Sequence, residues 1–300
     1  MAHSTTHTLR TRVRSRTKSP FTHVLTAIAL AYLGLLVIGP LAVVFASAFR
    51  NGVVPYLEAL THPDARSAMG LTVATALVVV PINLVFGVVA AWLLSKYEFR
   101  YKTLLLTLID LPFSVSPVVS GLVFVLLFGR SGWFGPLVER FSVRIIFAWP
   151  GIVLATCFVT FPIIVRELLS LMQSQGNAEE EAALSLGAGG FSIFFKVTLP
   201  KIRWALVYGV VLCNARAMGE FGAVSVVSGH IRGETNTLPL HVEVLYDEYQ
   251  FVGAFAAASV LTLLGLLTLG TKKALEWRGT RKPKPSTPQT DTIVLSEATS

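Results

Sequence analysis

The sequence is poor in charged residues and in cysteine. Only 14% of its 300 residues are charged, whereas a soluble domain carries about a quarter. The two cysteines, Cys157 and Cys213, both lie in apolar segments and provide no disulfide framework of the kind found in small secreted domains. Hydrophobic residues make up 53% of the chain. Together these features predict an integral membrane protein.

Catalytic and nucleotide-binding patterns are also missing from the sequence. We find no nucleophile elbow, no paired carboxylates and no cluster of metal-ligand residues. The nearest approach to a P-loop is Gly265 to Gly270, but Thr271 follows before Lys272, so the lysine is displaced. We therefore expect no catalytic residue, no metal site and no cofactor on this chain. If the protein uses ATP, a separate subunit must hydrolyse it.

Six apolar segments each approach the roughly 20 residues that a helix needs to cross a bilayer. They cover residues 25–49, 71–94, 104–128, 145–169, 204–228 and 251–269. The segments predict an all-α membrane protein with about six transmembrane helices. Pro112 and Pro117 fall in the third segment, where they mark either a kink or an irregular start of the span.

The chain divides into a basic tail, a transmembrane domain and a second polar tail. The first tail is 1–22, the transmembrane domain is 23–272, and the tail 273–300 is expected to be disordered because it is rich in Pro, Ser and Thr. The basic tail and the apolar run after it resemble a signal peptide, with a cleavage-like site at Ala46-Ser47-Ala48. That run is much longer than the roughly 7–15 residues of a signal core, so we interpret it as an uncleaved first span.

The distribution of Lys and Arg predicts the orientation of the chain. Six spans put both ends on one side, and most of the 25 Lys and Arg residues fall on that side. They are Arg10, Arg12, Arg14, Arg16, Lys18, Lys96, Arg100, Lys102, Lys196, Lys201, Arg203, Lys272, Lys273, Arg278, Arg281, Lys282 and Lys284. The opposite side has Arg50, Arg66, Arg130, Arg140, Arg144 and Arg232. The positive-inside rule therefore places both termini in the cytoplasm, and topology explains the net charge of +8 without nucleic-acid binding.

A polar interruption lies between the fourth and fifth spans, from Glu179 to Pro200. Its first residues are acidic, which is favourable near a helix N-terminus. Ala182 and Ala183 favour a helix, Gly187 is typical of a residue that ends one, and Pro200 closes the segment. From composition alone, this segment is either an ordinary interfacial helix or a compact knob presented to a partner.

The amino-acid sequence of this segment resembles the EAA loop of ABC-importer permeases. The matching features are Glu181-Ala182-Ala183, then Gly187, then Leu199-Pro200, with Val197 where isoleucine is usual. The resemblance implies the ABC importer type I permease fold and a coupling helix within 176–200 that docks on a separate ATPase subunit. The residues that it assigns to ATPase coupling are Glu179, Glu180, Glu181, Ala182, Ala183, Gly187 and Pro200.

Several charged or polar residues lie inside predicted spans. A charge in mid-membrane costs several kcal/mol, so it usually faces a partner or a water-filled path. In the fifth span, Arg216 and Glu220 are four residues apart and share a helix face with each other, while Asn214 lies on another. Either the three residues form a polar stripe near the translocation path, or Arg216 and Glu220 form an ion pair that stabilises helix packing. We expect Arg166 to snorkel to the interface and Asp110 to be structural.

The segment from Asn214 to Ala223, NARAMGEFGA, resembles the corresponding region of permeases in oxyanion importers for sulfate and molybdate. Its continuation to His241 is similar to the CysW-type permeases of sulfate/thiosulfate importers. This resemblance covers most of the chain and is strongest over 179–249. It implies a heterodimer with a related second permease, two copies of a cytoplasmic ATPase and a periplasmic sulfate/thiosulfate-binding protein that docks near loop 229–250.

We therefore expect a multi-pass permease subunit of an ATP-driven sulfate/thiosulfate importer in a bacterial inner membrane. It would form half of the translocation path. One alternative is the permease of a molybdate/tungstate ABC importer, which would share the coupling helix. Another is a self-sufficient ion-coupled anion transporter, which would transport without ATP. A membrane-embedded enzyme has no visible catalytic residues in this sequence.

Overall fold

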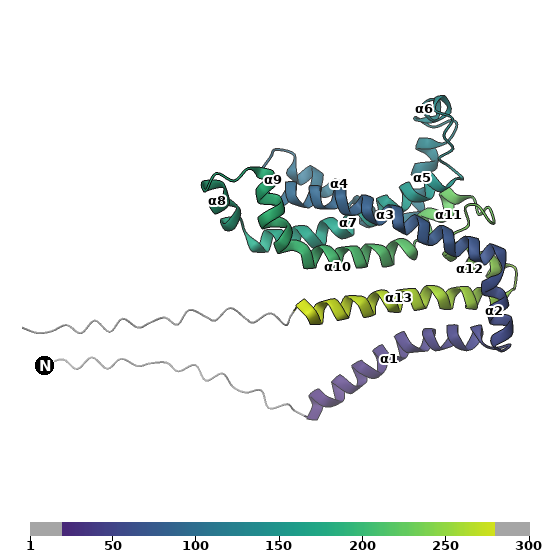
Figure 1. Cartoon of the computed structure of the whole chain (residues 1–300). Helices are drawn as coiled ribbons and strands as arrows, with labels where there is room; N and C mark the ends of the chain where they lie inside the picture. The colour runs from purple at the N-terminus through teal and green to yellow at the C-terminus, as the bar shows by residue number, and fades with distance from the viewer. Residues whose placement is uncertain (1–19, 280–300) are drawn as a thin grey trace, which may run out of the picture.

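The computed structural model describes residues 20–279, with side chains described for residues 23–274. Within that range every regular element is helical, which confirms the predicted all-α class (Figure 1). The predicted tails, 1–22 and 273–300, lie mostly outside the described residues. The helices are α1 (Pro20–Ala48), α2 (Val53–Thr61), α3 (Pro63–Lys96), α4 (Lys102–Ser114), α5 (Pro117–Phe128), α6 (Gly135–Arg140), α7 (Trp149–Gln175), α8 (Ala178–Ser185), α9 (Gly190–Ile193), the π-helix η1 (Phe194–Thr198), α10 (Leu199–Met218), α11 (Gly222–Ser228), α12 (Leu238–Asp247) and α13 (Phe251–Gly279).

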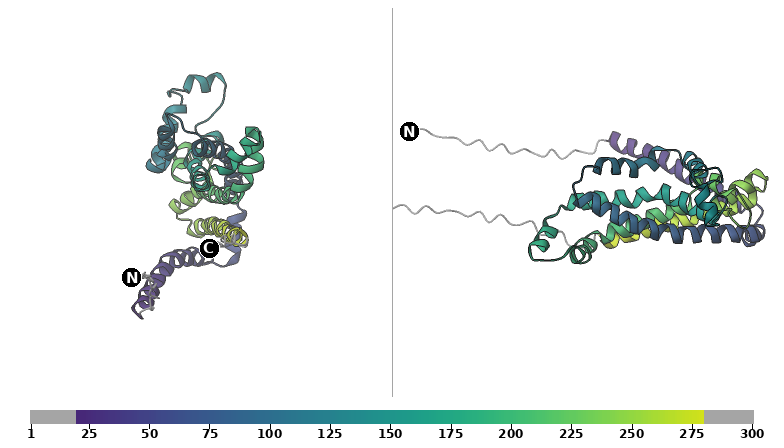
Figure 2. Two further views of the ribbon diagram at one scale, coloured as in Figure 1. Left: turned by 90° about the vertical axis from the view of Figure 1, so that its left-hand side faces the viewer. Right: turned by 90° about the horizontal axis from the view of Figure 1, so that it is seen from above.

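Four of the described helices are long and apolar enough to cross a membrane. They are α1, α3, α7 and α13, and they account for the first, second, fourth and sixth predicted spans. α3, α7 and α10 form the centre of the bundle, while α1 and α13 lie side by side on one flank (Figures 1 and 2). α13 continues past the domain boundary predicted at residue 272.

The third and fifth predicted spans are not continuous helices. α4 and α5 meet at an angle of 110° across Val115 and Ser116, so the pair counts as a broken span or a re-entrant loop. Pro117 explains this break, because the residue before a proline avoids the α-helical region, and Ser116 adopts an extended ψ of 134°. Pro117 itself occupies the start of α5. α4 is helical from Lys102 and contains Pro112, so the chain breaks in the middle of the predicted span and not at an irregular start.

The second break separates α10 from α11, which are bent by 51° relative to each other. α5 and α11, the short helices that follow the two breaks, pack closely on one another. A Cβ atom on Gly121 of α5 would lie only 2.6 Å from the carbonyl oxygen of Ala223 in α11, so only glycine permits this approach. The two breaks therefore place α5 and α11 in contact with each other. This contact cannot be recognised from the apolar segments of the sequence.

The ends of the bundle carry different elements. The start of α1, the end of α13 and the helices α8 and α9 gather at one end, on the left in Figure 1. α2, α11 and α12 lie at the other end. This arrangement is the one that an even number of crossings requires, since both described ends of the chain and the 176–200 loop share one side.

Candidate functional site

The polar interruption after the fourth span forms a helix, α8, as the sequence predicts. Its first turn contains Glu179, Glu180 and Glu181. The helix ends at Ser185, and Gly187 follows in the terminating turn with a left-handed φ of +82° that favours glycine. The Gly187 N–H donates to the Leu184 carbonyl at 2.9 Å, and the Ala188 N–H donates to the Ala183 carbonyl at 3.0 Å. These two bonds form a Schellman motif, so the helix-ending role of Gly187 is confirmed.

Lys96, the last residue of α3, anchors the start of the 176–200 loop. Its ammonium donates to the Gly176 carbonyl at 2.9 Å, to Asn177 Oδ1 at 3.0 Å and to Glu180 Oε2 at 2.8 Å. The Lys96 and Glu180 side chains are only 11% and 13% exposed. The other Glu180 oxygen accepts from the Thr198 hydroxyl at 3.0 Å. Glu180 therefore fastens the loop to the bundle, a role that the sequence analysis did not distinguish from that of its neighbours.

The other two glutamates have different surroundings. Glu179 forms an ion pair with Lys201 of α10 at 3.0 Å, while Glu181 is exposed. The loop is thus tied to α3 through Lys96 and to α10 through Lys201. In the sequence, Lys96 and Lys201 had contributed only to the prediction of orientation.

The 176–200 loop also exposes large apolar side chains at the end of the bundle. We call Leu184, Leu186 and Phe191 the loop tip. Leu186 is 89% exposed and Phe191 is 86% exposed. Figure 2 shows α8 and α9 projecting from the bundle in the view from above. Exposed apolar side chains grouped in this way are typical of a surface that contacts another protein.

The sequence suggested that Pro200 closes the loop segment, but in the structure it does not. The chain is helical from Gly190 through α9, η1 and α10 to Met218. Pro200 lacks the N–H that a regular helix needs, and the preceding Leu199 N–H donates to Phe194, five residues back. A π-turn therefore carries the helix past the proline and joins the loop directly to the fifth span.

The predicted pairing of Arg216 with Glu220 is present and spans the second break. Arg216 Nη1 lies 2.9 Å from Glu220 Oε2, forming an ion pair without hydrogen-bond alignment. The Glu220 side chain is 1% exposed, and its Oε1 accepts the Ala223 N–H of α11 at 3.2 Å. Glu220 therefore satisfies the backbone where α11 begins. The amide of Asn214 contacts the sulfur of Met218 at 3.5 Å, and Arg216 remains partly exposed.

Arg166 does not snorkel along α7 as expected. Its Nε donates sideways to Asp110 Oδ1 of α4 at 2.8 Å, and its guanidinium lies 4.5 Å from the centre of the Phe113 ring. The sequence predicted that Asp110 is structural but did not identify Arg166 as its partner, because the two residues are far apart in sequence. The contact joins α4 to α7 within the predicted membrane region.

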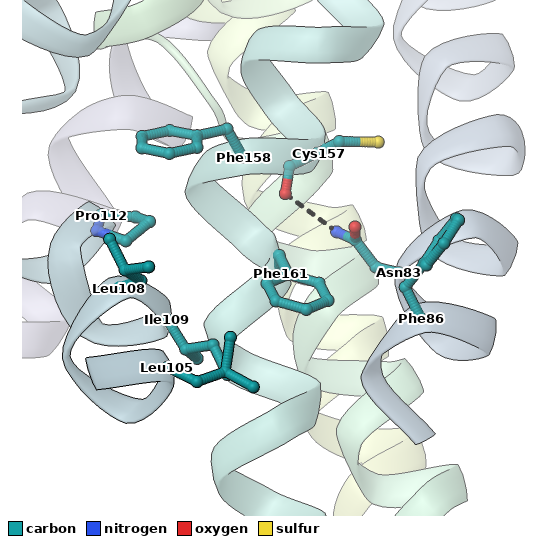
Figure 3. Close-up of a pocket in the computed structure, with 9 residues that line it drawn as sticks. All are labelled: Asn83, Phe86, Leu105, Leu108, Ile109, Pro112, Cys157, Phe158 and Phe161. Atoms are coloured by element: carbon teal, nitrogen blue, oxygen red, sulfur yellow. Dashed lines mark hydrogen bonds between the residues drawn. The ribbon is translucent and has the colours of Figure 1, made fainter. Parts of the chain in front are cut away.

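A cavity of about 400 Å³ lies between α3, α4 and α7 (Figure 3). Apolar side chains such as Phe86, Leu108 and Phe161 dominate its lining. The amide of Asn83 donates to the Thr160 hydroxyl at 2.7 Å and to the Cys157 carbonyl at 3.2 Å. An anion would lose its hydration there and gain little in return, so this cavity is a poor anion site.

The segment predicted as polar loop 229–250 contains helix α12. His230 pairs with Glu243 at 3.2 Å, and Arg232 pairs with Glu248 and, at 4.0 Å, with Asp64 at the start of α3. His241 of this segment is buried, with only 4% of its surface exposed. These contacts hold α12 against α3 at the end of the bundle opposite α8.

The stability of α12 should depend on pH through His241. Burial lowers its pKa from the ordinary 6.5, while the nearby Asp64 carboxylate opposes this effect. As the pH drops below 6.5, His241 takes up a proton in the unfolded segment but not in the folded one. The free energy of local unfolding should therefore decrease as the pH drops below 6.5, and it should stay constant at higher pH. Hydrogen exchange of α12 amides, corrected for intrinsic rates and measured at about pH 5.5 and 7.5, checks this expectation. A His241→Phe variant should lose the dependence, and an unchanged dependence in that variant would contradict the assignment.

Comparison with known proteins gives a family match over most of the described chain. The family described as "Binding-protein-dependent transport system inner membrane component" matches residues 83–278. The matched range starts within α3 and ends within α13. It includes both broken spans and the whole 176–200 loop.

Two curated relatives come from Escherichia coli strain K12. The sulfate transport system permease protein CysW is 54% identical over 239 residues, covering 80% of this chain and 82% of the relative. The sulfate transport system permease protein CysT is 35% identical over 254 residues, covering 85% of this chain and 92% of the relative. A chain in the crystal structure of a bacterial alginate ABC transporter matches with a TM-score of 0.73 and 14% identity, over 88% of this chain and 96% of that one. At this identity the structural match concerns the fold alone.

Proposed function

Because this chain belongs to the family of binding-protein-dependent transport system inner membrane components, we propose that it is the permease subunit of an ATP-driven sulfate/thiosulfate importer. The chain has the expected permease fold of an ABC importer and is a transport subunit rather than an enzyme. The observation that carries the choice of anion is the 54% identity to a sulfate permease over 80% of the chain.

The proposal includes a defined set of partners. Both CysW and CysT of one organism are similar to this chain, which supports a heterodimer with a related second permease. Two copies of a cytoplasmic ATPase and a periplasmic sulfate/thiosulfate-binding protein would complete the importer. This chain would bind no cofactor, since ATP would be bound by the ATPase. The protein would span a bacterial inner membrane with both termini in the cytoplasm.

The anchoring of the 176–200 loop suggests how a movement of the ATPase would be transmitted to the transmembrane helices. Closure of the ATPase dimer would push on the loop tip, and the contacts of Lys96 and Lys201 would pass this displacement to α3 and α10. In this proposal the docking side of α8 and its terminating turn comprises Glu181, Ala182, Ala183 and Gly187, while Glu179, Glu180 and Pro200 connect the loop to the bundle. Alternating access then follows from rigid movement of helices that the loop holds together.

Uptake by the complete complex tests the proposed function. Membrane vesicles or proteoliposomes containing the permeases, the ATPase and the binding protein should accumulate radiolabelled sulfate only when ATP is supplied. Unlabelled thiosulfate should compete, whereas molybdate and tungstate should not. Competition by molybdate alone would indicate the alternative importer, and ATP-independent uptake by this chain alone would indicate a self-sufficient transporter.

Arg216 and Glu220 should behave differently on mutation. We propose that Arg216, with Asn214, faces the translocation path, because its side chain is 42% exposed while that of Glu220 is 1% exposed. Arg216→Gln should lower sulfate uptake by roughly tenfold while the complex still assembles. Glu220→Gln should reduce assembly, because it removes the buried counter-charge. Copurification and uptake distinguish these outcomes, and equal assembly defects in both variants would make Arg216 a packing residue only.

A further inference from the structure

The Asp110–Arg166 pair is a partly exposed ion pair within the predicted membrane region. The Arg166 side chain is 54% exposed and that of Asp110 is 44% exposed. At a rise of 1.5 Å per residue, Arg166 lies about 14 Å from the end of α7 at Gln175. Its guanidinium turns sideways to Asp110 and Phe113 rather than toward that end. A half-exposed ion pair at this depth cannot face lipid without a large cost, so it faces protein or water.

The donors of Arg166 are only partly used. Its Nε donates to Asp110, and within residues 23–274 its two terminal nitrogens make no hydrogen bond. A guanidinium presents its N–H groups in a planar fork that matches two oxygens of an oxyanion. The fork is therefore available to a tetrahedral oxyanion on its exposed side, even while Asp110 remains bound to Nε.

The pair differs from that of Arg216 and Glu220 in what the carboxylate does. Glu220 is buried and also accepts a backbone N–H at the start of α11, so it is committed to the fold. Among the described residues, the carboxylate of Asp110 accepts a hydrogen bond from Arg166 and from no other group, while Ser114 donates to the Asp110 backbone carbonyl. Asp110 can therefore balance the charge of Arg166 when no anion is present and weaken anion binding enough to permit release.

The two arginines occupy different levels of the bundle. Gly209 of α10 packs beside Ile164 and Glu167 of α7, which sets the register of the two helices. α10 runs on from Gly209 to Arg216, a rise of about 10 Å away from the α8 end. Arg166 therefore lies nearer the loop end than Arg216 does.

We propose that Arg166 is a contact residue for the transported oxyanion, on the side of the translocation path nearer the 176–200 loop. Asp110 holds its guanidinium in position between transport events. This inference rests on the proposed function for the existence of an anion path, but it does not depend on which oxyanion is carried.

The test uses a cysteine reporter beside an intact Arg166. In the complete complex, Cys157 and Cys213 are replaced by alanine and Phe113→Cys is introduced, since its ring lies next to the guanidinium. Leu267→Cys on α13 is the matched control, because it is exposed and surrounded by exposed apolar residues. A membrane-impermeant, negatively charged thiosulfonate should modify the cysteine at 113 and not the cysteine at 267. Sulfate should slow modification at 113 by several-fold or more.

Arg166→Gln in the reporter background should abolish protection by sulfate, while Asp110→Asn should retain it. In the native background, Arg166→Gln should raise the KM for uptake, and Arg166→Lys should recover part of the loss. Loss of assembly in both Arg166 variants, or protection that persists without Arg166, would overturn the inference. An unreactive cysteine at 113 would overturn it as well.

The failure of the proposed function would look different. If the wild-type complex imports molybdate or another oxyanion, protection at 113 should follow that anion in a panel of sulfate, thiosulfate and molybdate. Protection by the imported anion would support Arg166 and correct only the substrate. Protection by none of the anions would reject Arg166 whatever the complex imports.

Discussion

Replacing Gly187 by tryptophan should abolish uptake and leave the protein in the membrane. The left-handed φ of +82° opposes any side chain at this position, and an added Cβ meets no atom of the described chain within 4 Å. The tryptophan would therefore strain the end of α8 and project into the space where the proposed ATPase docks. No membrane-embedded contact is disturbed, so insertion should be normal. Sulfate uptake, together with the amount of the variant in membranes, measures both expectations.

Gly187 and Gly189 form a matched pair that separates backbone strain from bulk. Both have open surroundings, but φ is +82° at Gly187 and −70° at Gly189. Gly187→Ala should destabilise the end of α8 by about 1–2 kcal/mol, whereas Gly189→Ala should have little effect. Normal uptake by Gly187→Trp would contradict the coupling role of this loop. Equal defects in the two alanine variants would contradict the importance of the Schellman turn.

Replacing Lys96 by alanine should uncouple the 176–200 loop from α3. The substitution removes three hydrogen bonds and leaves Glu180, a side chain only 13% exposed, without its cation. Breaking a largely buried ion pair costs about 3–5 kcal/mol when one partner remains, so α8 should detach and uptake should fall by far more than tenfold. Uptake and hydrogen exchange of α8 measure the two effects.

Lys102 provides the control for this experiment because it lies at the same end of the bundle. It pairs with Glu98 at 2.6 Å; the Lys102 side chain is 18% exposed, but that of Glu98 is 88% exposed and so stays hydrated when Lys102 is removed. Exposed pairs contribute little, so Lys102→Ala should transport almost normally. Exchanging the charges of Lys96 and Glu180 should restore part of the uptake lost in Lys96→Ala. A Lys96→Ala variant as active as Lys102→Ala would show that the loop does not need this anchor.

Local features of the sequence were sufficient to predict α8 and its termination. The acidic first turn and Gly187 act on neighbouring residues, so their structural effect can be predicted from the local sequence. The break before Pro117 was also foreseeable, since proline restricts the residue before it. The path of the chain beyond Pro200 was not, because the π-turn at η1 lets the helix continue past the proline.

The contacts that give these elements their partners could not be predicted from spacing. Lys96 reaches Glu180 and Arg166 reaches Asp110 only after α3, α4 and α7 have packed. The bend after Met218 was hidden for the same reason. The break depends on Glu220 accepting a backbone N–H of α11 and on α5 packing against that helix, and neither contact is visible in the sequence. Tertiary packing therefore decided which charges anchor the loop and which remain open.

Photocrosslinking from Leu186 tests the central claim most directly. This side chain is 89% exposed at the loop tip, so a photoreactive amino acid there should be tolerated. In the complete importer, illumination should join this chain to the ATPase subunit, and the yield should change between the nucleotide-free and ATP-bound states. Crosslinks to the periplasmic binding protein, or none to the ATPase in any nucleotide state, would contradict the claim that the 176–200 loop receives the work of ATP hydrolysis.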